Sequence, residues 1–299
     1  MRQKIKYSAV IAAGILLFSE IPASAENQYQ LGETVSTGKD TGYSESLAVT
    51  AKDPHYGWEL GEFFVSGYTR TSADEKGRLL FLKNAGEQMP LYFHLEQIID
   101  QLNGNTALSI ADDWEGYDQI FQVEKQAFGR GALIIRYTDY QNQTDTKVLT
   151  DYLSGIETGT DTEVLLCEEG DYQIALDYQM KNNPYQIGGF DILPTYTSYS
   201  IRFAFSVRNG NTAAFLEDAE TGESLTDTVF AENGFYINTE KSHYLDIDVQ
   251  REVFSDHDSR SEIFTSPAKE GEVYTEEGIY TVTVRNPYTD SDPAVKTLY

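Results

Sequence analysis

Strict alternation of apolar and polar residues constrains the fold of this chain more than any other feature. The clearest case is Ser198–Arg208, whose alternate apolar residues would share one face of an extended strand: Tyr199, Ile201, Phe203, Phe205 and Val207. The residues between them are small or charged, which predicts a half-buried strand of an antiparallel sheet. Asn209-Gly210 follows at once, and both residue types accept the positive φ of a tight turn.

The same alternation recurs at Ala132–Tyr140 and at Leu245–Val249, whereas helical spacing occurs only in a short stretch near residues 95–102. The chain is rich in Tyr (21) and Phe (15), and 40% of its 299 residues are hydrophobic. Aromatic residues suit a pleated, half-buried surface, and this apolar fraction suffices for packed cores. We therefore expect an all-β protein, and the length indicates two domains.

A short repeated sequence suggests that the two domains are alike. Glu168-Glu169-Gly170-Asp171-Tyr172 leads into an alternating strand, and so does Glu276-Glu277-Gly278-Ile279-Tyr280. The two tyrosines are 108 positions apart, about the length of one immunoglobulin-type domain.

Both pentapeptides resemble the tyrosine corner of immunoglobulin-like and fibronectin type III sandwiches. In that motif, a Tyr that opens a late strand donates its hydroxyl to the backbone a few residues upstream. The resemblance implies two antiparallel, Ig-like β-sandwich domains in tandem, with Tyr172 and Tyr280 as structural corners. A single cysteine, Cys167, excludes a disulfide-stapled domain. The alternative is that E-E-G-x-Y is simply a common route from an acidic turn into a strand.

The first 25 residues have the three parts of a secretory signal peptide. Arg2, Lys4 and Lys6 precede an apolar run at residues 9–18, and Ala23-Ser24-Ala25 supplies the small residues of a cleavage site. The run is shorter than the ~20 residues that span a bilayer. We expect cleavage near Ala25 and a secreted or envelope-associated protein, with an uncleaved anchor as the alternative. An exported chain with a single thiol is typical of bacteria, because small secreted domains of eukaryotes usually rely on disulfides.

Proline and glycine suggest where the domains meet. Asn182-Asn183-Pro184 and Gly188-Gly189 form the clearest cluster of such residues between alternating segments. We expect a signal peptide at 1–25, a flexible lead-in at 26–52, a first sandwich at 53–182, a linker at 183–189 and a second sandwich at 190–299. The final residues also have the pattern of a strand, which is compatible with an anchor or further modules beyond them.

The formal net charge of −26 restricts the partners of the chain. Such a surface repels the phosphates of nucleic acids and disfavours adsorption to anionic lipid. No compensating cluster of Lys and Arg occurs, and no transmembrane segment follows the signal peptide. The expected partner is a surface protein or a glycan.

The sequence offers little support for catalysis. Its four histidines are widely spread, and motifs for a zinc protease, a nucleophile elbow or a P-loop are absent. A triad or a pair of carboxylates assembled in space would leave no local signal, so an unrecognised hydrolase is the third hypothesis. We expect a protein that is not an enzyme and holds no cofactor.

Two weaker sites are suggested by composition. Asp256, Asp258 and Asp290 lie in predicted loops and could hold calcium, although solvated surface acids are the preferred explanation. The predicted loop around Trp114 could bind a glycan, with the ring stacking on a sugar and nearby groups contacting its hydroxyls: Asp112, Asp113 and Tyr117. Alternatively, Trp114 packs onto the sheet, as large aromatic residues commonly do.

These patterns together favour an exported, non-catalytic surface or secreted protein that acts as a spacer, adhesin or protein-interaction scaffold. A carbohydrate-binding module protein is the main alternative.

Overall fold

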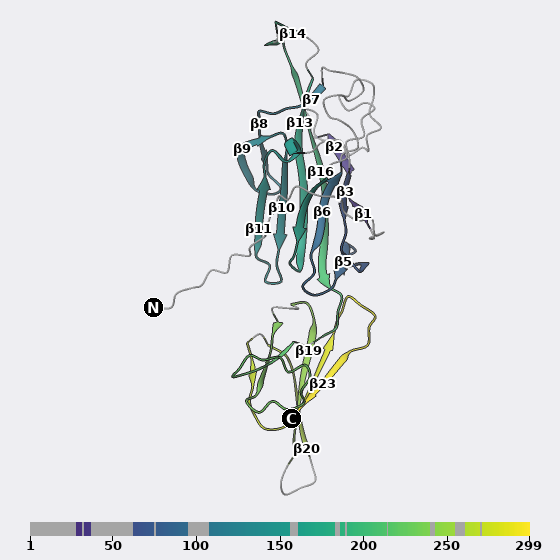
Figure 1. Ribbon diagram of the computed structural model, residues 1–299, viewed down its shortest axis with the longest axis vertical. Helices are drawn as coiled ribbons and strands as arrows, with labels where there is room; N and C mark the ends of the chain where they lie inside the picture. Colours follow the sequence, from purple (N-terminus) through teal and green to yellow (C-terminus); the bar gives the residue numbers. More distant parts are fainter. Residues whose placement is uncertain are drawn as a thin grey trace, which may run out of the picture. The chain divides into compact units, whose positions relative to one another are not determined.

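The computed structural model describes residues 28–31, 33–36, 62–74, 76–94, 108–155, 161–182, 186–188, 190–213, 215–239, 243–254, 261–269 and 271–299. The predicted signal peptide at 1–25 lies outside these residues. The described part is all-β, as predicted, and consists of antiparallel sheets with a single turn of 3-10 helix, η2 (Tyr152–Gly155) (Figure 1). No helix in these ranges is long and apolar enough to cross a membrane.

The chain divides into two compact units, but not where the sequence suggested. The first unit comprises Met1–Tyr68 and Gln88–Ser206, and the second comprises Thr69–Glu87 and Val207–Tyr299. The later division falls inside one strand, β16 (Thr195–Asn209), rather than in a linker at 183–189. The units therefore have other bounds than the predicted ranges 53–182 and 190–299, because contacts between segments distant in sequence define them.

The first unit is built from two facing sheets. One contains, in order, β1 (Tyr29–Leu31), β3 (Glu62–Val65), β6 (Met89–His94) and β12 (Asp161–Leu166). The other contains, in order, β11 (Thr144–Leu149), β10 (Ala132–Thr138), β13 (Gly170–Asn182) and β16, with β2 (Glu33–Ser36) beside β16 and β7 (Leu108–Ile110) beside β13. Aromatic rings join the sheets, as where the centroids of the buried Phe63 and the half-buried Phe203 lie 5.2 Å apart.

A separate two-stranded hairpin, β8 (Trp114–Asp118) and β9 (Val123–Gly129), belongs to the same unit. Phe128 of this hairpin packs with Ile134 of β10 and Ala175 of β13. The hairpin therefore covers part of the β10–β13 sheet.

The predicted flexible lead-in at 26–52 is wrong for its first residues. Tyr29–Leu31 pairs with β3, and Glu33–Ser36 pairs with β16. Leu31 is buried, so this segment contributes to the core of the first unit. A Gly/Ser/Thr-rich composition gave no sign of these pairings, because the partner strands supply the hydrogen bonds.

The Pro/Gly cluster at 183–189 is part of a hairpin. Strands β13 and β16 are neighbours in one sheet, and between them β14 (Gln186–Ile187) pairs with β15 (Phe190–Asp191). Gly188 has φ 60°, the left-handed region that suits a tight turn. Figure 1 shows β14 beyond the end of the long strand β13. Turn residues mark this hairpin tip just as they would mark a linker.

The second unit also has two sheets around one core. One contains β17 (Leu216–Asp218), β18 (Phe235–Ile237) and β21 (Val273–Tyr274); the other contains β20 (Ser261–Pro267), β19 (Asp246–Phe254), β22 (Ile279–Arg285) and β23 (Ala294–Leu298), both in these orders. Leu216 and Phe235 from the first sheet pack with Val249 and Val282 from the second. A hairpin of β4 (Arg70–Ala73) and β5 (Leu79–Lys83) also belongs to this unit.

The two units repeat one arrangement of seven strands. In chain order these are β3, β6, β10, β11, β12, β13 and β16 in the first unit, and β17 to β23 in the second. In each unit the first, second and fifth strands are neighbours in that order in one sheet. The fourth, third, sixth and seventh strands are neighbours in that order in the other sheet.

Equivalent tyrosines occupy the sixth strand of each unit. Tyr172 donates its hydroxyl to the carbonyl of Glu168 at 2.9 Å, and Tyr280 donates its hydroxyl to the carbonyl of Glu276 at 2.8 Å. Both acceptors lie four residues upstream. Burial raises the pKa of Tyr172 well above its ordinary value, so the hydroxyl keeps its proton as a donor.

The glycine two residues before each tyrosine permits a close approach to the third strand. A Cβ on Gly170 would lie 2.2 Å from the ring of Tyr137, and a Cβ on Gly278 would lie 2.9 Å from the carbonyl oxygen of Glu252. Any side chain at either position would force the two strands apart. The two E-E-G-x-Y segments thus make matching local structures.

Replacing either corner tyrosine with phenylalanine is expected to destabilise its own unit by about 1 kcal/mol, because one partly buried hydrogen bond is lost while the ring remains. Chemical denaturation of Tyr172→Phe and Tyr280→Phe would measure the change. Tyr117→Phe is the matched control, since Tyr117 is 60% exposed. A loss for the control equal to that for Tyr172→Phe would contradict the structural role of the corner.

Candidate functional site

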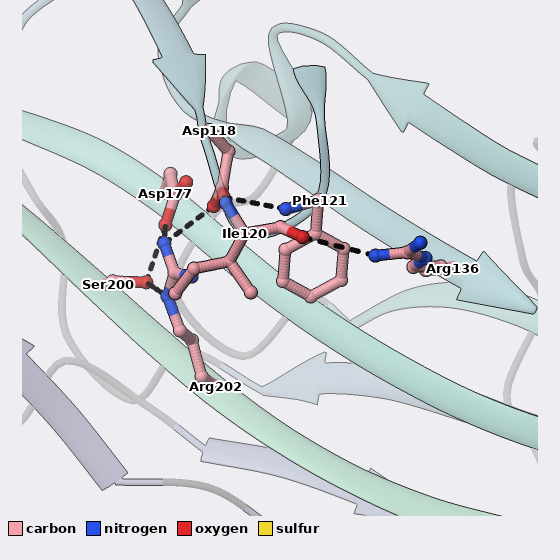
Figure 2. A network of polar contacts seen from close by, with 7 residues as sticks. All are labelled: Asp118, Ile120, Phe121, Arg136, Asp177, Ser200 and Arg202. Atoms are coloured by element: carbon pink, nitrogen blue, oxygen red, sulfur yellow. Dashed lines mark hydrogen bonds and ion pairs between the residues drawn. The ribbon is translucent and has the colours of Figure 1, made fainter.

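The most unusual polar cluster in the described chain lies in the first unit, where two acids, a serine and an arginine meet (Figure 2). Arg202 donates from Nη2 to Asp118 at 2.5 Å and more weakly to Asp177 at 3.4 Å. Its Nε donates to Ser200 at 2.8 Å, and the Ser200 hydroxyl donates to Asp177 at 2.5 Å. Both carboxyl groups are buried, whereas Arg202 is partly exposed.

Three parts of the unit supply these side chains. Ser200 and Arg202 lie on β16, Asp177 lies on the neighbouring strand β13, and Asp118 ends β8. Asp118 also accepts the backbone N–H groups of Ile120 (2.8 Å) and Phe121 (3.0 Å), which shape the turn into β9. The cluster therefore links the β8–β9 hairpin to the sheet beneath it.

The surrounding turn adds two further contacts. The guanidinium of Arg202 lies 5.7 Å from the centre of the Phe121 ring, and Arg136 donates from Nη1 to the carbonyl of Ile120 at 3.1 Å. Charge on Arg202 is thus balanced by a carboxylate and shielded by an aromatic face. These contacts hold the turn from both sides (Figure 2).

Burial gives Asp177 an unusual ionisation. Its pKa is raised from 3.8 to about 7, chiefly by desolvation and also by the neighbouring carboxyl of Asp118, against the lowering by Ser200 and Arg202. At pH values below about 7, Asp177 is therefore mostly neutral beside the Asp118–Arg202 ion pair. A neutral acid of this kind can act as a proton donor in enzymes, which makes the cluster the strongest candidate for chemistry.

The cluster lines neither of the two best-formed cavities of the described residues. One cavity of about 10 Å³ in the first unit is lined by residues including Ile135, Tyr137 and Leu166. Another, of about 100 Å³ in the second unit, is lined by residues including Leu216 and Val282. Neither cavity contacts Asp118, Asp177 or Arg202. The geometry therefore supports a clamp within the fold better than a substrate site.

The residues predicted to bind a glycan do not form a common platform. Trp114 lies at the start of β8 rather than in a loop, and its ring packs edge-on against Phe128 at 5.2 Å. Tyr117 is exposed, and Asp112 and Asp113 are exposed in the bend before the strand. Along β8, the inward positions are Trp114, Gly116 and Asp118, so Tyr117 points the other way. Trp114 therefore packs within the protein, which is the alternative to stacking on a sugar.

Of the predicted calcium ligands, Asp256 and Asp258 lie outside the described residues. Asp290 is exposed, and its carboxylate accepts Nη2 of Arg70 at 3.3 Å within the second unit. Among the residues that the structure describes, no group of three or more His, Cys, Asp or Glu side chains gathers as metal ligands would. Asp290 thus pairs with a cation of the protein itself.

The sequence did not reveal the Asp118–Arg202 cluster. The alternation of β16 places Ser200 and Arg202 on its polar face, which predicted exposure to solvent. Ser200 is instead buried, because the β8–β9 hairpin covers this end of the polar face. A buried acid far away in sequence, Asp118 or Asp177, has no local signal that distinguishes it from the many surface acids.

Comparison with known proteins identifies no relative, since no family model, curated protein or solved structure matches the chain.

Proposed function

We propose that this chain is an exported, non-catalytic protein of two tandem immunoglobulin-like modules, which acts at a cell surface as a spacer, adhesin or protein-interaction scaffold. The observation that carries the proposal is the repeated arrangement of seven strands, with an equivalent tyrosine hydrogen bond in each unit. Immunoglobulin-like sandwiches likewise place the first, second and fifth strands in one sheet and the third, sixth and seventh in the other, with a tyrosine near the start of the sixth strand, strand F. Here the fourth strand of each unit lies beside the third.

The interior of each unit supports a role that depends on surfaces. Ligand pockets commonly have volumes of about 300–1,000 Å³. The cavities of about 10 and 100 Å³ in the two units are far smaller. Sandwiches with such small interior cavities suit a protein that holds or presents a binding surface.

Buried polar contacts also favour rigidity over catalysis. In the first unit, the Asp118–Arg202 pair and the hydroxyl of Ser200 bond to one another rather than to an open cleft. Catalytic acids need access to a reacting group within hydrogen-bonding reach. A clamp that fixes a hairpin on a sheet needs no such access.

Export tests the proposal directly. The full chain, expressed in a bacterial host, is expected to begin at Glu26 after processing, because Ala23-Ser24-Ala25 precedes that residue. Sequencing the N-terminus of the protein from the medium or the envelope would measure this. An unprocessed chain retained in the cytoplasm would contradict the proposal.

A binding assay on the same exported protein distinguishes the scaffold role from the alternative, a carbohydrate-binding module. Incubation with a panel of glycans and cell-wall polysaccharides is expected to give no specific binding, because Trp114 packs against Phe128. The exposed side chains of Tyr117, Asp112 and Asp113 are the feature that keeps this alternative open. Binding that is lost in Trp114→Ala or Tyr117→Ala would replace the scaffold hypothesis with a carbohydrate-binding one.

A further inference from the structure

The hairpin between β13 and β16 displays the three most exposed large apolar side chains in the described chain. Ile187 is 71% exposed, Phe190 is 79% exposed and Leu193 is 84% exposed. All three fall within seven consecutive positions, and Figure 1 shows β14 beyond the end of β13. We call these three residues the apolar tip. Apolar side chains gathered at one protruding site usually mark a contact surface.

The backbone presents these side chains in a defined way. Ile187 and Phe190 are direct cross-strand partners in the β14–β15 pair, so their side chains share one face of the ribbon. Leu193 has φ 56°, a left-handed conformation that a bulky residue rarely adopts. Strain of this kind persists where it serves a function, and here it accompanies a leucine that is almost fully in solvent.

The tip is almost uncharged in a chain that is strongly acidic. Gln186–Ser198 contains one charged residue, Asp191, whereas 23% of the whole chain is charged. Tyr196, which is 40% exposed, follows the tip along β16. Tyrosine is enriched where a protein passes through the headgroup region of a bilayer, with apolar residues beyond it.

Size and shape decide which partner can cover this surface. A stable dimer needs about 20–30 residues from each partner, and the three side chains of the tip are far too few. A bilayer interface, by contrast, surrounds a protruding apolar group without a complementary surface. The net charge of −26 opposes approach to anionic lipid, so the membrane must be predominantly zwitterionic.

We propose that Ile187, Phe190 and Leu193 insert into the interface of a zwitterionic lipid bilayer and so attach the protein to a membrane surface. This inference rests on the proposed export of the chain, and it names a lipid surface as the target of the adhesive role. Binding comes from the apolar side chains, and the acidic remainder of the protein restricts it to membranes of low negative charge.

Vesicle flotation tests the inference with the exported form, which begins at Glu26, because the apolar run at residues 9–18 would itself bind lipid. The probes are vesicles of phosphatidylcholine alone and of phosphatidylcholine mixed with phosphatidylglycerol. The wild-type protein is expected to float with the first and more weakly with the second. A variant carrying Ile187→Ser, Phe190→Ser and Leu193→Ser is expected to lose binding by at least about tenfold.

The second unit provides a matched control. Phe254, Ile263 and Phe264 are also exposed, at 60%, 58% and 50%, and their triple replacement by serine removes a similar apolar area. This control is expected to bind phosphatidylcholine like the wild type. Both variants should unfold near the wild-type denaturant concentration, because every replaced side chain is at least half exposed.

The outcomes separate this inference from the proposed function. A wild-type protein that floats with neither vesicle, a control that loses as much binding as the tip variant, or self-association through the tip without lipid binding would overturn the inference. In each case, processing and surface exposure would still support an exported scaffold. If the full chain stays unprocessed in the cytoplasm while the form beginning at Glu26 still floats with phosphatidylcholine, the result would instead support the tip and contradict export.

Discussion

Raising the pH from about 5 to about 8 is expected to lower the unfolding free energy of the first unit by about 2 to 3 kcal/mol through Asp177 alone. Burial raises the pKa of this carboxyl from 3.8 to about 7. Between these values the folded protein keeps a proton that the unfolded chain releases. The stabilisation is therefore complete below the ordinary pKa and is lost as the pH rises through about 7.

The two tryptophans make this measurement specific. The second unit contains neither of the two tryptophans of the chain, and Trp114 begins β8 in the first unit. Fluorescence of Trp114 during urea denaturation thus reports on the first unit, while circular dichroism reports on both. A plot of unfolding free energy against pH should fall steadily from about pH 5 and flatten above about pH 7.

Asp177→Asn is the matched control for this titration. An amide has the shape of the neutral acid and can accept the Ser200 hydroxyl, but it does not ionise. The variant should resemble the wild type near pH 5 and be the more stable of the two near pH 8. A wild-type profile with no slope, or a variant with an equal slope, would show that another group or no group titrates.

Asp118→Ala is expected to destabilise the first unit by about 3 to 5 kcal/mol. The substitution leaves Arg202 without its closest carboxylate and removes the acceptor of the Ile120 and Phe121 N–H groups. Since Asp118 is only 3% exposed, water cannot fully replace these hydrogen bonds. Asp118→Asn, which retains an acceptor, should cost less.

Hydrogen exchange would locate the effect. Amide protons of the β8–β9 hairpin, Trp114–Gly129, should exchange faster in Asp118→Ala, because the carboxylate joins that hairpin to β16. Asp113→Ala is the control, since Asp113 lies five residues upstream and is exposed. Unchanged stability and exchange in Asp118→Ala would mean that the hairpin is held by its apolar contacts with β10 and β13.

Local patterns predicted the strands well because they report on one residue and its immediate neighbours. Ser198–Arg208 lies within β16, and Leu245–Val249 overlaps β19. The alternation of apolar and polar residues can be recognised in the sequence because one face of each strand packs against a core. The tyrosines at 172 and 280 were likewise visible, since the hydrogen-bond acceptor lies only four residues away in the chain.

Such local patterns could not predict which strands pair with segments distant in the sequence. Tyr29–Leu31 becomes a strand only because β3 lies beside it, and Thr69–Glu87 joins the second unit through contacts with residues more than a hundred positions later. Proline and glycine mark a change of chain direction, which occurs both in linkers and in hairpins. The Pro/Gly cluster at 183–189 was expected to be a linker, but it is part of the hairpin that β14 and β15 form. Burial of Ser200 and Asp177 depends on a hairpin that covers them, which the alternation of their own strands cannot show.

The sequence by itself determined that this chain is all-β, where many of its strands run and which glycines and tyrosines turn the chain into the sixth strand of each unit. These properties depend on side-chain alternation and on contacts within a few residues. Only the tertiary structure decided which strands are neighbours, that Asp118 and Asp177 share Arg202, and that three apolar residues protrude at Ile187–Leu193. Those properties depend on which distant segments exclude water from one another, and that exclusion exists only once the chain has folded.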